Sequence, residues 1–99
     1  MKHFLIEITY QAPLEEIDKV TPEHRAFLQK GYDSGILLYS GRQVPPAGGL
    51  ILARAESQEE VEMFFAGDPY RIAGMGNYRF VEFGPTKFQP FLQGWIEGK

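Results

Sequence analysis

Residues 50–65 read LILARAESQEEVEMFF and predict a strand that leads directly into a helix. The apolar run 50–55 is typical of a strand. Ser57 and Glu60 then form a capping box, because the Ser57 oxygen can accept a hydrogen bond from a backbone N–H of the first helical turn while the Glu60 side chain reaches back. The helix that follows carries its apolar side chains inward and ends at Gly67.

Three more strands are predicted on either side of this unit. Residues 3–10 alternate, with an apolar face that begins at Phe4, as in a strand with one buried face. The apolar run 36–39 lies between glycines and predicts a buried strand, with 43–49 as its exit loop. Residues 78–83 alternate again and predict the last strand.

The segment between the first two strands predicts two consecutive helices. The first is short, begins at Pro13 and ends near Val20. Thr21 then suits the N-cap of a second helix, with Pro22 at its first position and Gly35 at its end.

The main elements therefore follow the order strand, helix, strand, strand, helix, strand. This order predicts an α+β protein with the ferredoxin-like split βαβ fold (βαββαβ), in which both helices cover one face of a four-stranded antiparallel sheet. We expect a single domain over residues 1–99, with 91–99 as an irregular C-terminal tail. The other sheet face, which includes Leu5, is left bare, and an exposed apolar face favours a homodimer that forms through the sheet.

The composition excludes several classes of function. The net charge is −3 and the 10 Lys and Arg residues are scattered along the chain, so we expect no nucleic-acid partner. The chain has no cysteine, which excludes disulfides, thiolate metal sites and a cysteine nucleophile. No apolar run approaches the roughly 18 residues of a membrane span, so we expect no membrane association and a cytoplasmic location.

His24 and Asp68 are the candidate catalytic residues. With Thr21 as the N-cap, His24 is the third residue of its helix, where the positive end of the helix dipole disfavours a protonated imidazole and leaves a base. Asp68 precedes Pro69 and suits the N-cap of a short helix. Antiparallel packing of the two main helices brings these ends together, where a carboxylate would fix the imidazole tautomer. The structural alternatives are a packed histidine and an aspartate that only caps its helix.

Ser40, Arg42 and Tyr70 are weaker candidates for binding a substrate. Ser40 and Arg42 flank a glycine at the end of the second strand, and Arg42 can bind an anion through a bidentate contact. A solvated arginine is the alternative. Tyr70 is a candidate cavity wall, although aromatic residues at such positions more often belong to the core. His3 is expected in solvent or at an interface, and the spacing of the two histidines suggests no metal site.

Two segments resemble the YCII-related (YciI-like) family of small bacterial proteins, namely EHRAFL at 23–28 and GDPYRIAG at 67–74. The resemblance covers nearly the whole chain. It implies a ferredoxin-like homodimer of the dimeric α/β-barrel superfamily and a catalytic pair at His24 and Asp68. Many relatives have Gly-Pro after the second strand, where this chain has SGR at 40–42, so the resemblance does not assign the substrate.

One branch of this family contains a dehydrochlorinase that acts on a chlorinated hydroxyhydroquinone. The resemblance and the residues together predict a small cofactor-independent enzyme that uses His24 and Asp68 for proton transfer on a small cyclic or aromatic substrate. The expected reaction is that of an isomerase, a lyase or a dehydrochlorinase-like enzyme. The alternative is a non-catalytic homodimer that binds a small ligand or has a regulatory or structural role.

Overall fold

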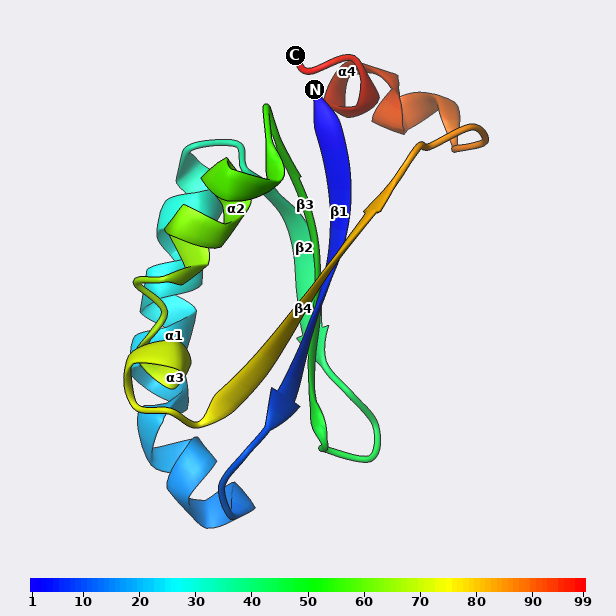
Figure 1. Ribbon diagram of the computed structural model, residues 1–99. Coiled ribbons are helices and arrows are strands. Elements are labelled where there is room, and N and C mark those ends of the chain that lie inside the picture. Colours follow the sequence, from blue (N-terminus) through cyan, green and yellow to red (C-terminus); the bar gives the residue numbers. More distant parts are fainter.

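The computed structural model describes residues 1–99 as a four-stranded sheet covered by helices (Figure 1). The strands are β1 (Lys2–Tyr10), β2 (Leu37–Arg42), β3 (Gly48–Ala55) and β4 (Gly76–Phe83). The helices are α1 (Leu14–Asp33), α2 (Gln58–Phe65), α3 (Pro69–Ile72), the 3-10 helix η1 (Pro90–Leu92) and α4 (Gln93–Ile96). None of the helices combines the length and the hydrophobicity that crossing a bilayer would need.

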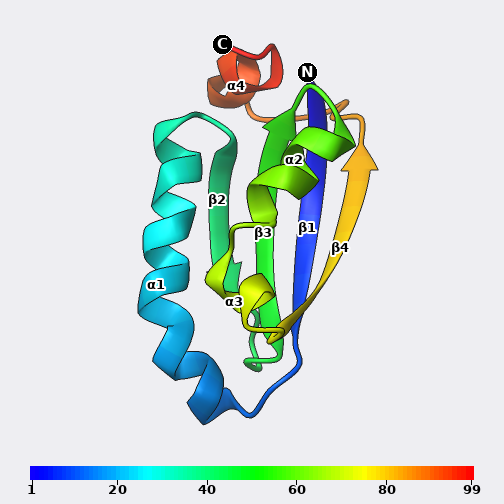
Figure 2. The same cartoon turned by 60° about the vertical axis from the view of Figure 1, so that its left-hand side comes forward.

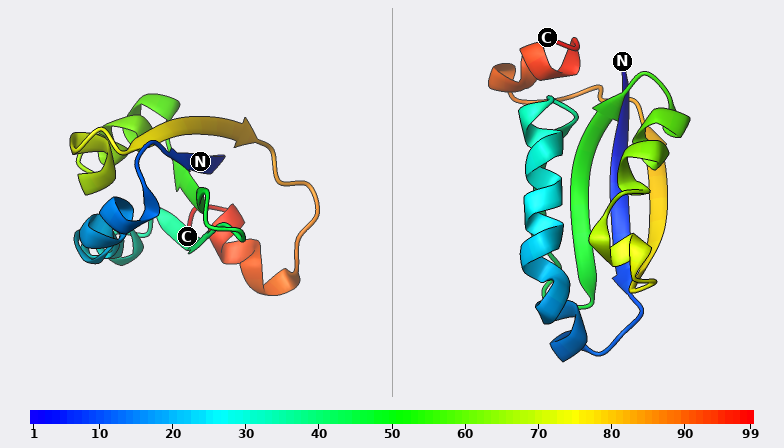
Figure 3. Two further views of the ribbon diagram at one scale, coloured as in Figure 1. Left: turned by 90° about the horizontal axis from the view of Figure 1, so that it is seen from below. Right: turned by 90° about the vertical axis from the view of Figure 1, so that its left-hand side faces the viewer.

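The sheet has the strand order β2-β3-β1-β4, and every neighbouring pair of strands is antiparallel. Helices α1, α2 and α3 all lie on one face of this sheet, as Figures 2 and 3 show. The core lies between the two layers, where Phe4, Ile6 and Ile8 of β1 belong to the same buried cluster as Phe65 of α2. This is the predicted ferredoxin-like arrangement, and the prediction of the fold is confirmed.

The two helices predicted before β2 are one continuous helix, α1, which runs through Pro22. Thr21 is therefore not an N-cap, and its hydroxyl donates a hydrogen bond to the Ile17 carbonyl oxygen, 2.9 Å away within the helix. A proline inside a helix removes a backbone hydrogen bond and costs about 3 kcal/mol. Burial offsets this cost, since buried residues recur at helical spacing from Ile17 to Leu28. Figure 2 shows the first turns of α1, in blue, at an angle to the rest of the helix.

All four strands are longer than predicted, and in β3 one glycine explains part of the difference. Residues 40–42, which follow the predicted strand 36–39, lie within β2, and Gly48, predicted in the exit loop, begins β3. A Cβ atom at Gly48 would lie 1.8 Å from the carbonyl oxygen of Ile8. Gly48 therefore lets two strand backbones approach closely, which is a second reason for a glycine besides a turn.

The C-terminal segment, predicted to be irregular, contains η1 and α4 and lies against one end of the sheet (Figure 1). Two side chains donate hydrogen bonds to its backbone: His3 Nε2 to the Ile96 carbonyl over 3.2 Å, and Arg54 Nη1 to the Trp95 carbonyl over 2.8 Å. The Arg54 guanidinium also lies over the Trp95 ring, 4.0 Å from its centroid. His3 is consequently buried within the chain and does not lie in solvent.

The sheet face opposite α1, α2 and α3 carries apolar side chains that the chain covers only in part. They come from all four strands and are Leu5, Tyr39, Leu50, Leu52, Val81 and Phe83. Apart from the C-terminal segment at one end, no helix lies on this face (Figure 1).

Candidate active site

His24 and Asp68 are in direct contact across the fold. Nδ1 of His24 lies 2.7 Å from Oδ1 of Asp68. His24 lies in the middle of α1 and Asp68 lies between α2 and α3, so the two meet because α3 packs beside α1. The prediction that His24 is the third residue of its helix is wrong, since α1 begins at Leu14. The helix dipole acts within the first and last turns and so does not explain the state of this imidazole.

The Asp68 carboxylate is fully buried and accepts three hydrogen bonds. The Tyr70 N–H donates to Oδ1 over 3.1 Å, which makes Asp68 the N-cap of α3, as predicted. The Tyr78 hydroxyl donates to Oδ2 over 2.5 Å, and His24 is the third donor. Because a carboxylate only accepts, Nδ1 of His24 carries a proton, and in the neutral imidazole Nε2 then keeps its lone pair. Asp68 caps a helix and orients an imidazole at the same time.

Tyr78 supports this contact and was not among the residues predicted for the site. Burial, together with the hydrogen bond to Asp68, raises the pKa of Tyr78 well above its ordinary value, so the hydroxyl stays protonated and remains a donor. The alternation of side chains along β4 could have indicated this role from the sequence. Tyr78 shares the helix-facing side of the strand with Phe80, and a tyrosine on such a face needs a partner for its hydroxyl.

Tyr70 covers one face of the His24 imidazole. The two rings are stacked, with their centroids 4.0 Å apart and an interplanar angle of 18°. The Tyr70 hydroxyl lies 2.6 Å from Oγ1 of Thr21. Since the Thr21 hydroxyl already donates to the Ile17 carbonyl, the Tyr70 hydroxyl is the donor in this contact. Burial raises the pKa of Tyr70, which keeps that hydroxyl protonated.

Arg42 and Ser40 approach the same space from β2. Arg42 donates from Nε to the Tyr10 hydroxyl over 3.0 Å and from Nη2 to the Asp18 carboxylate over 2.8 Å. The hydrogen bond that Arg42 donates to Asp18 raises the pKa of Arg42, so its charge is permanent. Oγ of Ser40 lies 2.5 Å from the Tyr32 hydroxyl. Both residues are thus oriented by neighbours before any ligand is bound.

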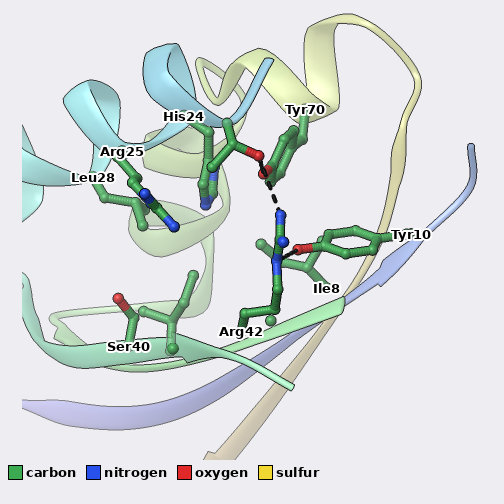
Figure 4. Close-up of a pocket in the computed structure, with 12 residues that line it drawn as sticks. Ile8, Tyr10, His24, Arg25, Leu28, Ser40, Arg42 and Tyr70 are labelled. Carbon is green, nitrogen blue, oxygen red and sulfur yellow. Dashed lines mark hydrogen bonds between the residues drawn. The ribbon is translucent and has the colours of Figure 1, made fainter. Parts of the chain in front are cut away.

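These side chains surround an open cavity of about 220 Å³ between α1 and the strands β2 and β3 (Figure 4). Four of the five predicted site residues line it, namely His24, Ser40, Arg42 and Tyr70. Asp68 does not line the cavity and lies behind His24, where it can act only through the imidazole. Figure 4 shows the His24 ring extending from α1 with a nitrogen at its lower end, on the side of Ser40.

Arg25 also lines the cavity, and sequence reasoning gave it no role. A signal was present in the spacing of α1. Thr21, His24, Arg25 and Leu28 follow one another at i, i+3, i+4 and i+7, which places all four on one face of a helix. That face of α1 forms one wall of the cavity.

The comparison with known families extends this picture to the whole chain. The YCII-related domain matches residues 1–84. The chain belongs to the YCII-related family. The resemblance seen at 23–28 and 67–74 is thereby confirmed.

Among solved structures, this YCII-related protein is similar to 5-chloro-2-hydroxyhydroquinone dehydrochlorinase (TftG) from Burkholderia phenoliruptrix AC1100, in a complex with 2,5-dihydroxybenzoquinone. The sequence identity is 20% and the TM-score is 0.69, over 90% of this chain and 97% of that chain. At this identity the similarity shows a shared fold. No curated protein sequence matches the chain.

Proposed function

We propose that this YCII-related protein is a small enzyme in which His24 moves a proton on a small cyclic or aromatic substrate without a cofactor. The observation that carries the proposal is the contact of 2.7 Å between His24 and the buried Asp68, at the wall of an open cavity. An imidazole whose Nδ1–H is held by a carboxylate presents Nε2 as a general base.

The reaction is an isomerisation or an elimination. Nε2 of His24 takes a proton from an acidic C–H or O–H bond, and the electron pair of that bond moves into a new double bond. In an isomerisation, an existing double bond opens as the new one forms, and its electron pair takes the proton back from the imidazolium at another atom of the substrate. In an elimination, a leaving group such as chloride departs with its bonding pair, and the imidazolium releases its proton to water. A positioned base contributes about 10²–10⁴ in rate, so the proton that is removed must already be activated.

Ser40, Arg42 and Tyr70 are proposed to hold the substrate. A cavity of about 220 Å³ suits a single ring, since an apolar cavity of about 150 Å³ can hold benzene. TftG, which shares the fold, is a dehydrochlorinase of a hydroxyhydroquinone and was solved with a one-ring quinone. This likeness supports a one-ring substrate for the present protein.

The test is a turnover screen over lactones and halogenated hydroquinones with the wild type and the His24→Gln variant. We expect the variant to lose about 10²–10⁴ in rate on any substrate that the wild type converts. The matched control is His3→Gln, which changes the other histidine, at the far end of the sheet, and should leave turnover unchanged. Equal turnover by the wild type and His24→Gln would end the assignment of His24 as the base and favour a ligand-binding protein.

We also propose that the protein forms a homodimer through the bare sheet face. Leu5, Leu50 and Val81 contribute to an apolar surface there, and such surfaces usually mark an interface. In sedimentation at micromolar concentration, we expect a dimer for the wild type and a monomer for Leu50→Glu. Met63→Glu, on the outside of α2, is the control and should remain dimeric. A monomeric wild type would contradict the proposal. The cytoplasmic location inferred from composition also stays a prediction.

A further inference from the structure

We propose that the cavity beside His24 takes a small one-ring carboxylate and that Arg25 binds its charge. The inference rests on the proposed function for the choice of cavity and goes further by naming the charge of the ligand and the residue that recognises it.

The charges around the cavity are unbalanced. Two arginines, Arg25 and Arg42, line it, and no aspartate or glutamate does. The charge of Arg42 is matched by Asp18, which accepts its hydrogen bond over 2.8 Å. Arg25 has no ion pair and no side-chain hydrogen bond. Among the charged side chains that line the cavity, Arg25 is therefore the one without an ion partner. The Asp68 carboxylate lies behind His24, accepts from its Nδ1 and does not line the cavity.

Arg25 lines the open cavity and is also exposed to solvent, so an anion that enters the cavity can reach it. It lies one position after His24 on the same face of α1, and Figure 4 shows its guanidinium directed from the helix toward β2, beside the imidazole. An anion held by Arg25 therefore leaves the rest of its molecule next to the His24 ring. Because Arg25 and His24 are consecutive residues of α1, the group that binds the charge of the ligand and the proposed base lie side by side.

The chemistry of the lining selects a carboxylate on a ring. A guanidinium binds a carboxylate through two parallel hydrogen bonds, which fixes the orientation of the ligand as well as its charge. Ile8, Leu28 and Ile51 supply apolar surface for a ring. The Tyr10 hydroxyl accepts from Arg42, so its own proton is free to donate to a polar substituent on the ring.

The experiment measures binding and needs no turnover. Benzoate and salicylate are titrated by calorimetry into the wild type, Arg25→Gln and Lys30→Gln, together with their uncharged partners benzamide and salicylamide. Lys30→Gln is the matched control, because Lys30 is an exposed cation on the same helix that does not line the cavity. Circular dichroism checks that both variants retain the fold.

We expect at least one carboxylate to bind the wild type and Lys30→Gln equally, and to bind Arg25→Gln about tenfold more weakly, as loss of a charge-assisted hydrogen bond implies. The amides should bind all three proteins with the same low affinity. Added salt should weaken carboxylate binding to the wild type more than to Arg25→Gln. Carboxylate binding that fails even at millimolar concentration, or that is unaffected by Arg25→Gln, overturns the inference. If a carboxylate binds through Arg25 but His24→Gln leaves all turnover unchanged, the proposed function is wrong and the inference about Arg25 still holds.

Discussion

Replacing Tyr78 with Phe removes one hydroxyl from the support of the site and leaves the ring in place. That hydroxyl donates to Oδ2 of Asp68 over 2.5 Å. The ring contacts survive the change, because the Tyr78 ring packs beside those of Phe65 and Phe80, with centroids 6.0 and 6.4 Å away. The variant therefore isolates the hydrogen bond to the buried carboxylate.

The expected size of the effect follows from the burial of Asp68. A hydrogen bond to a charged group contributes about 1.5–3 kcal/mol, and its loss would leave a fully buried carboxylate oxygen without that donor. We expect Tyr78→Phe to lower the free energy of unfolding by about 2 kcal/mol, which for a domain of this size lowers Tm by about 10 °C. The matched control is Tyr32→Phe, which removes a hydroxyl that contacts the neutral Ser40 and should cost only about 0.5–1.5 kcal/mol.

Urea and thermal unfolding of both variants measure the loss in the free energy of unfolding and in Tm. The same measurements at alkaline pH give a second test. The pKa of Tyr78 is raised in the folded protein, so the unfolded chain loses this proton first as the pH increases. The stabilisation from Tyr78 is therefore complete below the ordinary tyrosine value of about 10 and is lost above it. The wild type should lose more stability in that range than Tyr78→Phe. Equal destabilisation by Tyr78→Phe and Tyr32→Phe, with identical alkaline profiles, would show that the hydrogen bond from Tyr78 to Asp68 stabilises the fold no more than one between neutral groups.

Two further predictions concern the site and the helix that carries it. Asp68→Asn should lower turnover of any substrate found in the screen by about 10²–10⁴ while circular dichroism stays native, because the imidazole loses the carboxylate that orients it; unchanged turnover would contradict the role given to Asp68. Gly31→Ala should lower the free energy of unfolding in urea by about 1–3 kcal/mol, because its Cβ would lie 2.6 Å from Cγ of Leu37 and 2.8 Å from Cζ of Phe64. Gly41→Ala meets no atom within 4 Å and should change stability by less than about 0.5 kcal/mol, so equal urea midpoints for the two glycine variants would show that α1 does not pack closely on β2.

Local patterns in the sequence predict most of the fold. The alternation in β1 places Phe4, Ile6 and Ile8 on the buried face, as observed. The capping box also forms, with the Glu60 N–H donating to the Ser57 hydroxyl over 3.2 Å. The Glu60 carboxylate accepts a hydrogen bond from the backbone N–H of Glu56, which is one residue before the N-cap Ser57. These elements are predictable because their signals depend on neighbours within a few positions.

The failures arise where tertiary packing decides the local structure. Pro22 and Thr21 suggest a helix start, but the buried face of α1 continues across them and keeps one helix. Gly48 suggests a loop, but its missing side chain makes room for the carbonyl oxygen of Ile8 on a neighbouring strand. Neither the buried face nor the neighbouring strand is visible from a few residues of sequence.

The candidate site was also predicted only in part, because tertiary packing decides some of its contacts. The contact between His24 and Asp68 follows from packing the helices on one face of the sheet. Asp68 lies just after α2, as expected, but His24 lies in the middle of α1 and not at the start of a helix. Tyr78 and Arg25 were missed because each resembles an ordinary residue of its element, a strand tyrosine and an exposed helix arginine. Only the position of Asp68 and the shape of the cavity distinguish them.

The tautomer of His24 decides whether its imidazole can act as the base, and it can be measured without a substrate. Nitrogen NMR chemical shifts of the imidazole, assigned by their disappearance in His24→Gln, report which ring nitrogen carries the proton at a pH where the ring is neutral. The contact with Asp68 predicts a protonated Nδ1 and an unprotonated Nε2 facing the cavity. A neutral ring with its proton on Nε2 would contradict the account, because that nitrogen could then not accept a proton from a substrate.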